Sequence, residues 1–259
     1  MSQTKKIAVI TGASSGMGRE FVTAIDTQQP LDEIWVIARR KDKLESLVGT
    51  TQATIRPIAL DLCKKADLDA YRDLLATESP DVAVLVNAAG FGKFKAFVDL
   101  TLEEQLAMID LNDKALVAMT YHTLPYMKAG SCIYQLGSLS SFQPVPYINV
   151  YGASKAFVLS FSRALNTELK KQKRGIRVMA VCPGWVKTDF FDTAVVDDTT
   201  ITYYNKYFTA EEVVKRALKD MKRGRDVSIC GASIRAQVTL TKLLPHGIVM
   251  EIWCKQQKK

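Results

Sequence analysis

The chain has 259 residues, of which 47% are hydrophobic, and it carries a formal net charge of +8 at pH 7. It contains no stretch of about eighteen apolar residues, and no charged amino-terminal segment followed by a long apolar core. These absences argue against a membrane-spanning helix and a secretory signal. We therefore expect a soluble, cytoplasmic protein.

Seven apolar runs alternate with helical patterns along the chain. The expected strands cover about 6–11, 33–38, 54–60, 81–87, 131–137, 176–182 and 226–230. Such alternation requires parallel strands with helices on both faces of the sheet. No low-complexity linker and no internal repeat interrupts it. We predict the α/β class, as a single-domain Rossmann-like doubly wound parallel sheet over residues 1–259.

The first expected strand leads into a glycine-rich turn at 11–18 and then into a helix over about 19–25. Gly12 allows a tight turn, Gly16 lets the backbone approach a pyrophosphate, and Gly18 permits close packing of helix on strand. Free amide groups at the start of the helix attract phosphate. The pattern predicts a dinucleotide site formed by Gly12, Ser14, Ser15, Gly16, Met17 and Gly18.

The end of the second strand bears on the choice of cofactor. NAD-binding folds place an acidic residue there, against the ribose 2′-hydroxyl. This chain instead has Ala38, Arg39 and Arg40 in succession. Arg39 can pair with a 2′-phosphate, assisted by Ser14 or Arg40. We prefer NADP(H), with NAD(H) as second choice; alternatively, both arginines simply leave the strand into solvent.

Tyr151 and Lys155 enclose the segment Tyr-Gly-Ala-Ser-Lys, and Ser138 lies thirteen positions upstream. Four-residue spacing on a helix places Tyr151 and Lys155 on one face, one turn apart. The pKa of a phenol is ordinarily about 10, and a neighbouring ammonium group lowers it. When hydride from a cofactor reaches a carbonyl carbon, Ser138 can donate a hydrogen bond to the oxygen and Tyr151 can donate the proton.

These elements, in this order, resemble the short-chain dehydrogenase/reductase family, and the resemblance extends from about Lys5 to the last strand near Cys230. It implies that Tyr151 is the general acid or base, while Lys155 lowers its pKa and holds the nicotinamide ribose. It also implies that Ser138 polarises the substrate carbonyl and that Asn112 supports a water-linked proton path. The fold and activity of that family become expectations for this chain.

The resemblance also implies cofactor contacts beyond the glycine-rich turn. Each group follows an expected strand, and Tyr151 and Lys155 complete the set. The groups are Asp61 and Leu62, then Asn87, Ala88 and Gly90, then Pro183, Gly184, Val186 and Thr188. Because carboxyl ends of parallel strands meet at one edge of the sheet, we expect all of these residues to converge there.

We therefore predict an NADP(H)-dependent oxidoreductase that interconverts a ketone or aldehyde with an alcohol, assembled as a homodimer or homotetramer. The alternative is an NAD(P)-sensing, non-catalytic binding protein of the same fold. Such a sensor has no need of Ser138, Tyr151 and Lys155 together, so their joint presence favours the enzyme.

The segment 187–208 is expected to cover the substrate, since it follows the turn at Pro183. Aromatic and apolar side chains supply two possible walls, Phe190, Phe191, Tyr203, Tyr204 and Tyr207 on one side, and Phe142, Val145, Pro146 and Tyr147 on the other. They predict an apolar pocket for hydrophobic ketones or secondary alcohols, steroid-like compounds included. The alternative is that these side chains pack against the core or a neighbouring subunit.

The residues 231–257 form a helical extension that departs from the family's common pattern. A helix is expected over 236–244, Pro245 should break it, and a second helical run ends near Cys254. The extension is amphipathic and suits capping of the pocket, subunit contact or a membrane surface. Polar residues interrupt its apolar face, which favours the first two roles.

Cysteine and histidine usage indicates neither a metal nor a redox site. The five cysteines, at 63, 132, 182, 230 and 254, are scattered and odd in number, which indicates a reducing compartment. Only two histidines occur, so a zinc cluster is not expected. The basic run at 170–174 follows a helical pattern, and we interpret it as a solvated helix terminus. No recognition helix or aromatic–basic strand motif indicates nucleic-acid binding.

Overall fold

The computed structural model describes residues 4–195, 200–201, 203–204 and 206–259. Its centre is a parallel seven-stranded sheet in the order β3-β2-β1-β4-β5-β6-β9. The strands are β1 (Lys6–Thr11), β2 (Glu33–Ala38), β3 (Thr54–Ala59), β4 (Asp81–Asn87), β5 (Cys132–Leu136), β6 (Arg177–Val181) and β9 (Val227–Ser228). The strand order reverses at β1, which pairs with β2 on one side and β4 on the other. The carboxyl edge beside β1 is therefore the expected place for a ligand.

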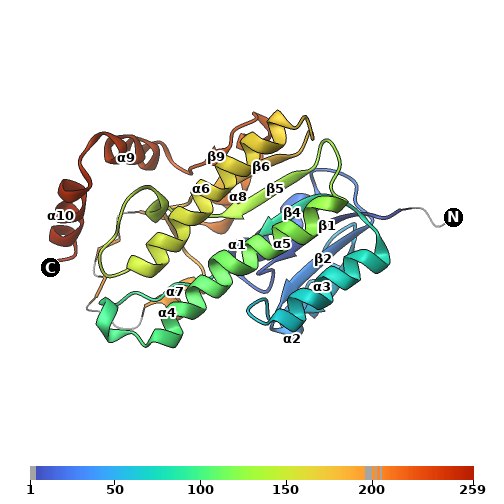
Figure 1. Cartoon of the computed structure of the whole chain (residues 1–259), viewed down its shortest axis with the longest axis horizontal. Helices are drawn as coiled ribbons and strands as arrows, with labels where there is room; N and C mark the ends of the chain where they lie inside the picture. Colours follow the sequence, from blue (N-terminus) through green and yellow to red (C-terminus); the bar gives the residue numbers. More distant parts are fainter. Residues whose placement is uncertain (1–3, 196–199, 202, 205) are drawn as a thin grey trace.

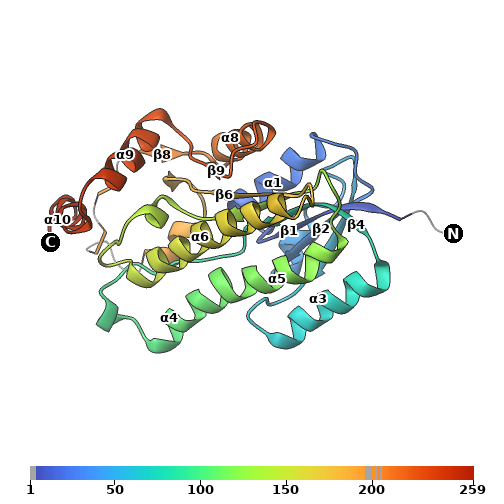
Figure 2. The same cartoon turned by 45° about the horizontal axis from the view of Figure 1, so that its top comes forward.

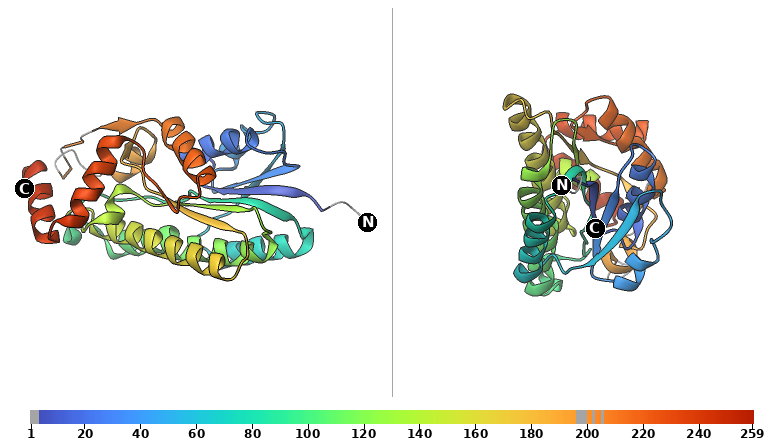
Figure 3. Two further views of the ribbon diagram at one scale, coloured as in Figure 1. Left: turned by 90° about the horizontal axis from the view of Figure 1, so that it is seen from above. Right: turned by 90° about the vertical axis from the view of Figure 1, so that its right-hand side faces the viewer.

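Helices cover both faces of this sheet, and Figure 3 shows the three layers from two directions. The helices are α1 (Gly16–Asp26), α2 (Lys41–Glu45), α3 (Lys65–Glu78), α4 (Leu102–Ile109), α5 (Leu116–Thr123), α6 (Asn149–Lys171), α7 (Phe190–Ala194), α8 (Ala210–Lys222), α9 (Ala232–Leu243) and α10 (His246–Gln256). Three short 3-10 turns are η1 (Phe97–Asp99), η3 (Leu124–Tyr126) and η4 (Leu139–Phe142), and η2 (Asp110–Ala115) is a π-helical turn.

One layer consists of α3, α5 and α6, which run side by side in Figure 2. Their apolar faces pack on the sheet through Tyr71 and Leu75 of α3, Met119 of α5 and Leu169 of α6. The opposite layer contains α1, α2 and α8, with Phe21, Leu44 and Val213 among the buried residues. Because both faces are covered, the central strands are apolar throughout, as the buried run Ile7–Ile10 of β1 illustrates.

The chain beyond β9 forms an arm at one end of the molecule, drawn in red in Figure 1. Gly231 has a φ of +88°, and a Cβ there would lie 2.6 Å from the Phe208 ring, so the turn into α9 requires glycine. Pro245 separates α9 from α10, as predicted. The helix α9 begins at Ala232, four residues before the expected start, because Ile234 is already part of its buried face.

A second, two-stranded sheet pairs β7 (Trp185–Val186) with β8 (Tyr207–Phe208). The predicted covering segment 187–208 thus leaves the main domain at β7 and returns at β8; its residues 196–199, 202 and 205 lie outside the described part of the chain. The last strand of the main sheet is shorter than predicted, since only Val227 and Ser228 pair with β6. Over the described residues, no helix combines the length and the apolar character that crossing a membrane requires.

Candidate active site

A cavity of about 350 Å³ opens at the carboxyl edge of the sheet. Predicted site residues from five parts of the chain line it, namely Met17, Ala88, Gly90, Ser138, Tyr151, Lys155, Pro183, Gly184, Val186 and Thr188. Apolar and aromatic side chains from the covering segment and the arm complete the wall. A cavity of this size falls in the usual range for small-ligand sites. The structure therefore brings ten of the predicted site residues, including Ser138, Tyr151 and Lys155, to one cavity.

The glycine-rich turn makes contacts that side chains would prevent. Gly12 has a φ of +67°, and a Cβ there would lie 2.7 Å from the backbone carbonyl of Ala88. A Cβ on Gly18 would lie 2.3 Å from the carbonyl oxygen of Gly12. Real Cβ atoms do not approach backbone this closely, so both positions require glycine. Backbone alone thus faces the carboxyl edge of β1, where a pyrophosphate could be bound by amide groups.

Gly16 connects this turn to the segment after β7. Its φ is +53°, and a Cβ there would lie 3.3 Å from the Thr188 side chain. The two segments, far apart in the sequence, are therefore in contact beside the cavity, which Met17 and Thr188 both line. The first turn of α1 contains no acidic residue, so no carboxylate there would repel an anion.

The two arginines after β2 behave differently. The Arg40 guanidinium donates hydrogen bonds of 3.1 Å to the hydroxyls of both Ser14 and Ser15. Arg39 is exposed, and the hydrogen bonds recorded for the described residues include none from its guanidinium. Arg40, which the sequence interpretation treated as an assistant, is therefore the arginine that reaches the glycine-rich turn, and Ala38 leaves no carboxylate beside it.

Tyr151 lies on the first turn of α6 and is 9% exposed. Its ring contacts Phe94 and Phe190, with centroid distances of 5.9 and 5.6 Å. Burial raises the pKa of Tyr151 to about 12, and a hydrogen bond with the Ser138 side chain opposes that rise. Because the pKa is well above 7, the phenol is protonated at neutral pH and can act as a proton donor.

Lys155 lies one turn further along α6 and is 5% exposed. Its ammonium group donates a 2.8 Å hydrogen bond to the carbonyl of Leu136 and lies 5.7 Å from the centroid of the Tyr151 ring. Burial lowers the pKa of Lys155 to about 8, while the charge of Asp113 raises it. We expected Lys155 to lower the Tyr151 pKa. In the structure burial of the phenol has the larger effect and raises that pKa.

Asn112 occupies the π-helical turn and is fully buried. Its side chain accepts a hydrogen bond from the Phe91 N–H (3.0 Å) and donates to the Phe91 carbonyl (2.9 Å) and to the Ser154 hydroxyl (3.0 Å). These bonds fix the loop after β4 against α6. A Cβ on Gly90 would lie 2.8 Å from the Asn112 Oδ1 and 3.3 Å from the Lys155 Nζ. Asn112 therefore adjoins the lysine, and its role in a proton path remains a prediction.

Some predicted contacts do not line the cavity. Asn87 ends β4 with its amide donating to Thr120 and Gln135, at 3.1 and 2.8 Å, inside the helical layer. Leu62 is buried in the core, and the Asp61 carboxylate accepts a hydrogen bond from the backbone of Cys63. These positions lie along the same sheet edge, after β4 and β3, so their contribution to an elongated dinucleotide remains a prediction.

The sequence interpretation missed residues that adjoin the site. The Phe94 ring contacts the Tyr151 ring, and Gly92 lies against it as well. A Cβ on Gly92 would lie 2.8 Å from the Cδ2 atom of Tyr151. Asp113 has a carboxyl oxygen with no hydrogen-bond partner, and burial raises its pKa to about 6. No periodicity or motif signals these positions, since each depends on the bend after β4 or on the π-helical turn.

The chain matches the family model for short chain dehydrogenase over residues 6–198. It belongs to the short-chain dehydrogenase family. The chain is 35% identical to sulfoacetaldehyde reductase 2 of Chromohalobacter salexigens over 193 residues, covering 71% of this chain and 74% of that protein. Members of the family are oxidoreductases with a Rossmann-like nucleotide-binding fold, in agreement with the fold and function classes expected from the sequence.

Two solved structures of this short-chain dehydrogenase fold resemble the chain over most of its length. A short-chain dehydrogenase from Sphingobium yanoikuyae in complex with NADPH is 28% identical, with a TM-score of 0.79 and 94% of each chain covered. The bulky-bulky ketone specific alcohol dehydrogenase from Comamonas testosteroni is 27% identical, with a TM-score of 0.73 and 92% of each chain covered. The Rossmann-like fold of the chain therefore matches solved structures of the family.

The residues present fit a dinucleotide. The side-chain-free contact between Gly12 and Ala88 leaves backbone to face a pyrophosphate, and Gly18 lets α1 begin directly behind it. Arg40 stands beside the turn with its charge available to an additional phosphate. At the other end of the cavity, Lys155 supplies hydrogen-bond donors close to Tyr151. These features are compatible with the pyrophosphate, an additional phosphate and the nicotinamide end of a dinucleotide.

Proposed function

We propose that this short-chain dehydrogenase is an NADPH-dependent reductase of hydrophobic ketones. The observation that carries the proposal is the position of Tyr151, a buried phenol with a raised pKa, at an apolar cavity that is also lined by Ser138 and by Met17 of the glycine-rich turn. A bound dihydronicotinamide would supply the hydride. The protein must then stabilise the oxygen of the substrate and give it a proton.

The chain's own residues can perform those tasks. Ser138 can donate a hydrogen bond to the carbonyl oxygen, which becomes more negative as the reaction proceeds. Tyr151 is protonated at neutral pH and can release its proton to that oxygen, because the resulting phenolate is stabilised by the Lys155 ammonium beside the ring. The protonated phenol present at pH 7 is the form that the reduction step requires.

The substrate class follows from the cavity wall. Phe94, which contacts the Tyr151 ring, also contacts Phe190 and Trp185, each with a centroid distance of 6.1 Å. Such a wall suits an apolar body attached to the carbonyl. The ketone named for the Comamonas testosteroni relative is bulky on both sides, and the C. salexigens relative is named for a small anionic aldehyde. The apolar wall of this chain favours the first kind of substrate.

The decisive test is Tyr151→Phe, which removes one hydroxyl and preserves the ring contacts. We expect kcat for ketone reduction to fall by at least about a hundredfold, the usual size of a general-acid contribution, while the Kd for NADPH stays within about twofold of wild type. The matched control is Tyr71→Phe, because Tyr71 is also fully buried and its hydroxyl is bonded to Thr123 at 2.7 Å, away from the cavity. Undiminished turnover in Tyr151→Phe would remove the proposed proton donor.

Cofactor preference is tested at Arg40. The pairing of a guanidinium with a phosphate contributes about 1.5–3 kcal/mol, so Arg40→Ala should weaken NADPH binding by about ten- to a hundredfold and leave NADH binding nearly unchanged. Lys128→Ala is the control, since it removes an exposed cation that pairs with Asp81 at the opposite edge of the sheet. Tighter binding of NADH than of NADPH by the wild type would contradict the assignment.

A further inference from the structure

The arm formed by α9 and α10 supplies one wall of the cavity. Val249, Ile252, Trp253 and Gln256 of α10 line it, together with Leu240 and Thr241 of α9. Figure 1 shows the arm at the end of the molecule opposite the amino terminus, beyond the start of α6. A substrate that occupies the cavity therefore meets side chains from the last quarter of the chain as well as from the catalytic helix.

Trp253 attaches the arm to the loop that precedes α6. Its indole N–H donates a 3.0 Å hydrogen bond to the carbonyl of Pro146. The ammonium group of Lys259 lies 5.6 Å from the centroid of the neighbouring Tyr147 ring. This loop leads directly into the first turn of α6, so the attachment acts close to Tyr151.

Gln257 attaches the same helix to the covering segment on the other side of the cavity. Its Oε1 accepts a 3.0 Å hydrogen bond from the Tyr203 N–H, and its Nε2 donates a 3.3 Å hydrogen bond to the Tyr203 carbonyl. The Gln257 side chain is fully buried, although glutamine is mostly exposed in proteins and the final residues of a domain are usually poorly ordered. Such burial indicates a specific contact.

The two attachments lie at the carboxyl end of α10, with Trp253 in its last turn and Gln257 as the residue that follows the helix. Gln257 follows Trp253 by four residues, and its N–H donates to the Trp253 carbonyl at 3.0 Å, so both side chains project from neighbouring positions on one face. Since a helical turn has a fixed rise, this pair determines how far apart Pro146 and Tyr203 lie. Tyr203 lines the cavity, and Pro146 directly follows Val145, which also lines it.

We propose that Gln257, acting with Trp253, is a positioning residue that sets the size of substrate the enzyme prefers. By fixing both flanks, it holds the apolar wall of α10 against the part of the ketone remote from the carbonyl. Bulky apolar ketones use that wall and small ketones do not. The inference rests on the proposed ketone-reductase function.

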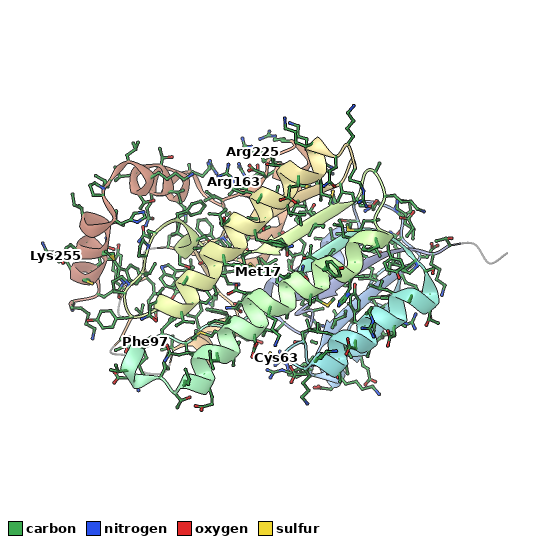
Figure 4. All side chains as sticks on the ribbon, in the orientation of Figure 1. Met17, Cys63, Phe97, Arg163, Arg225 and Lys255 are labelled. Carbon is green, nitrogen blue, oxygen red and sulfur yellow. The ribbon has the colours of Figure 1, made fainter. Side chains whose placement is uncertain are left out.

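The experiment compares Gln257→Ala with the conservative Gln257→Glu, using a diaryl ketone and 2-butanone as substrates. Gln257→Ala removes both bonds to Tyr203, whereas Gln257→Glu keeps an oxygen to accept from the Tyr203 N–H. The control is Lys255→Ala, an exposed residue of α10 labelled on the arm in Figure 4. Trp253→Phe keeps an aromatic ring, removes the bond to Pro146 and reduces the part of the cavity wall that the indole forms.

Lost contact with a remote part of a substrate raises KM and leaves kcat unchanged. For Gln257→Ala we expect KM for the diaryl ketone to rise about tenfold, with KM for 2-butanone and both kcat values within about twofold of wild type. Gln257→Glu and Trp253→Phe should give smaller rises, and Lys255→Ala none. Equal changes for the two ketones, a fall in kcat for both, or no change in KM would overturn the proposal.

Hydrogen exchange at the Tyr203 amide separates this proposal from the proposed function. The amide should exchange faster in Gln257→Ala than in wild type and keep its protection in Gln257→Glu and Lys255→Ala. This readout needs no turnover. If the wild type reduces neither ketone, the proposed function fails while the exchange pattern still reports the attachment. If the wild type reduces both ketones and exchange is unaltered in Gln257→Ala, the attachment fails alone.

Discussion

Lys155→Met should make the nucleotide-free protein more stable at neutral pH while it abolishes turnover. Burial lowers the pKa of Lys155 from 10.5 to about 8. A shift of this size means that the buried positive charge costs the folded state about 3 kcal/mol at pH 7. Methionine fills similar space without the charge but loses the hydrogen bond to Leu136, which is worth about 1 kcal/mol. A net gain of about 2 kcal/mol remains.

The stability gain of Lys155→Met over wild type should be larger at pH 7 than at pH 10. Since the folded-state pKa lies below the unfolded value, the folded chain holds this proton less tightly than the unfolded chain. The cost of the charge is present in full below pH 8 and disappears as the pH rises through 10.5. Wild type should therefore gain stability relative to Lys155→Met between these values, and near pH 10 the two should differ by less than about 1 kcal/mol.

Urea denaturation of wild type and Lys155→Met at pH 7 and pH 10 measures both quantities. For a chain of this length, a gain of about 2 kcal/mol corresponds to a rise in Tm of about 5 °C. Lys128→Met serves as the control, because Lys128 is exposed and the substitution removes the same charge without relieving burial. A variant less stable than wild type at pH 7, or a difference that is the same at both pH values, would refute the reasoning.

Two further substitutions test neighbours of the catalytic helix. Asp113→Asn removes the carboxylate whose charge raises the Lys155 pKa. The alkaline limb of the plot of kcat/KM against pH should therefore move to lower pH. An unchanged limb would show that Asp113 does not influence the lysine. Gly92→Ala places a Cβ 2.8 Å from Tyr151 and 3.0 Å from Phe190, so kcat should fall by more than about tenfold with NADPH affinity retained, because a small displacement of a reacting group is costly. Wild-type kcat in Gly92→Ala would mean that the ring tolerates the shift.

The sheet was predictable because its strands are buried on both faces and therefore form continuous apolar runs. The expected strands 6–11, 33–38 and 81–87 coincide with β1, β2 and β4. At the edge the signal is weaker: the run 226–230 is apolar only in part, and two residues of it pair in β9. Burial of the central strands, rather than local propensity, made the periodicity informative.

Parts of the site could not be predicted because they depend on the direction in which a side chain points and on how deeply it is buried. Arg39 and Arg40 are adjacent in sequence, yet only Arg40 bonds to Ser14 and Ser15, and sequence order does not say which of two neighbours turns toward a loop. Helical spacing placed Tyr151 above Lys155 correctly, but spacing contains no measure of burial, which governs the pKa of both groups. Gln257 and Tyr203 are linked across 54 positions without any motif.

The junction of Gly12, Gly18 and Ala88 has a consequence for redesign. Two segments, the glycine-rich turn and the loop after β4, meet there through main-chain atoms alone. A side chain added at one of these positions could therefore not be accommodated by shortening a side chain at another. Attempts to exchange one nicotinamide coenzyme for the other should leave this junction untouched and randomise Ala38, which is only partly buried, and Arg40, whose exposed side chain reaches Ser14 and Ser15.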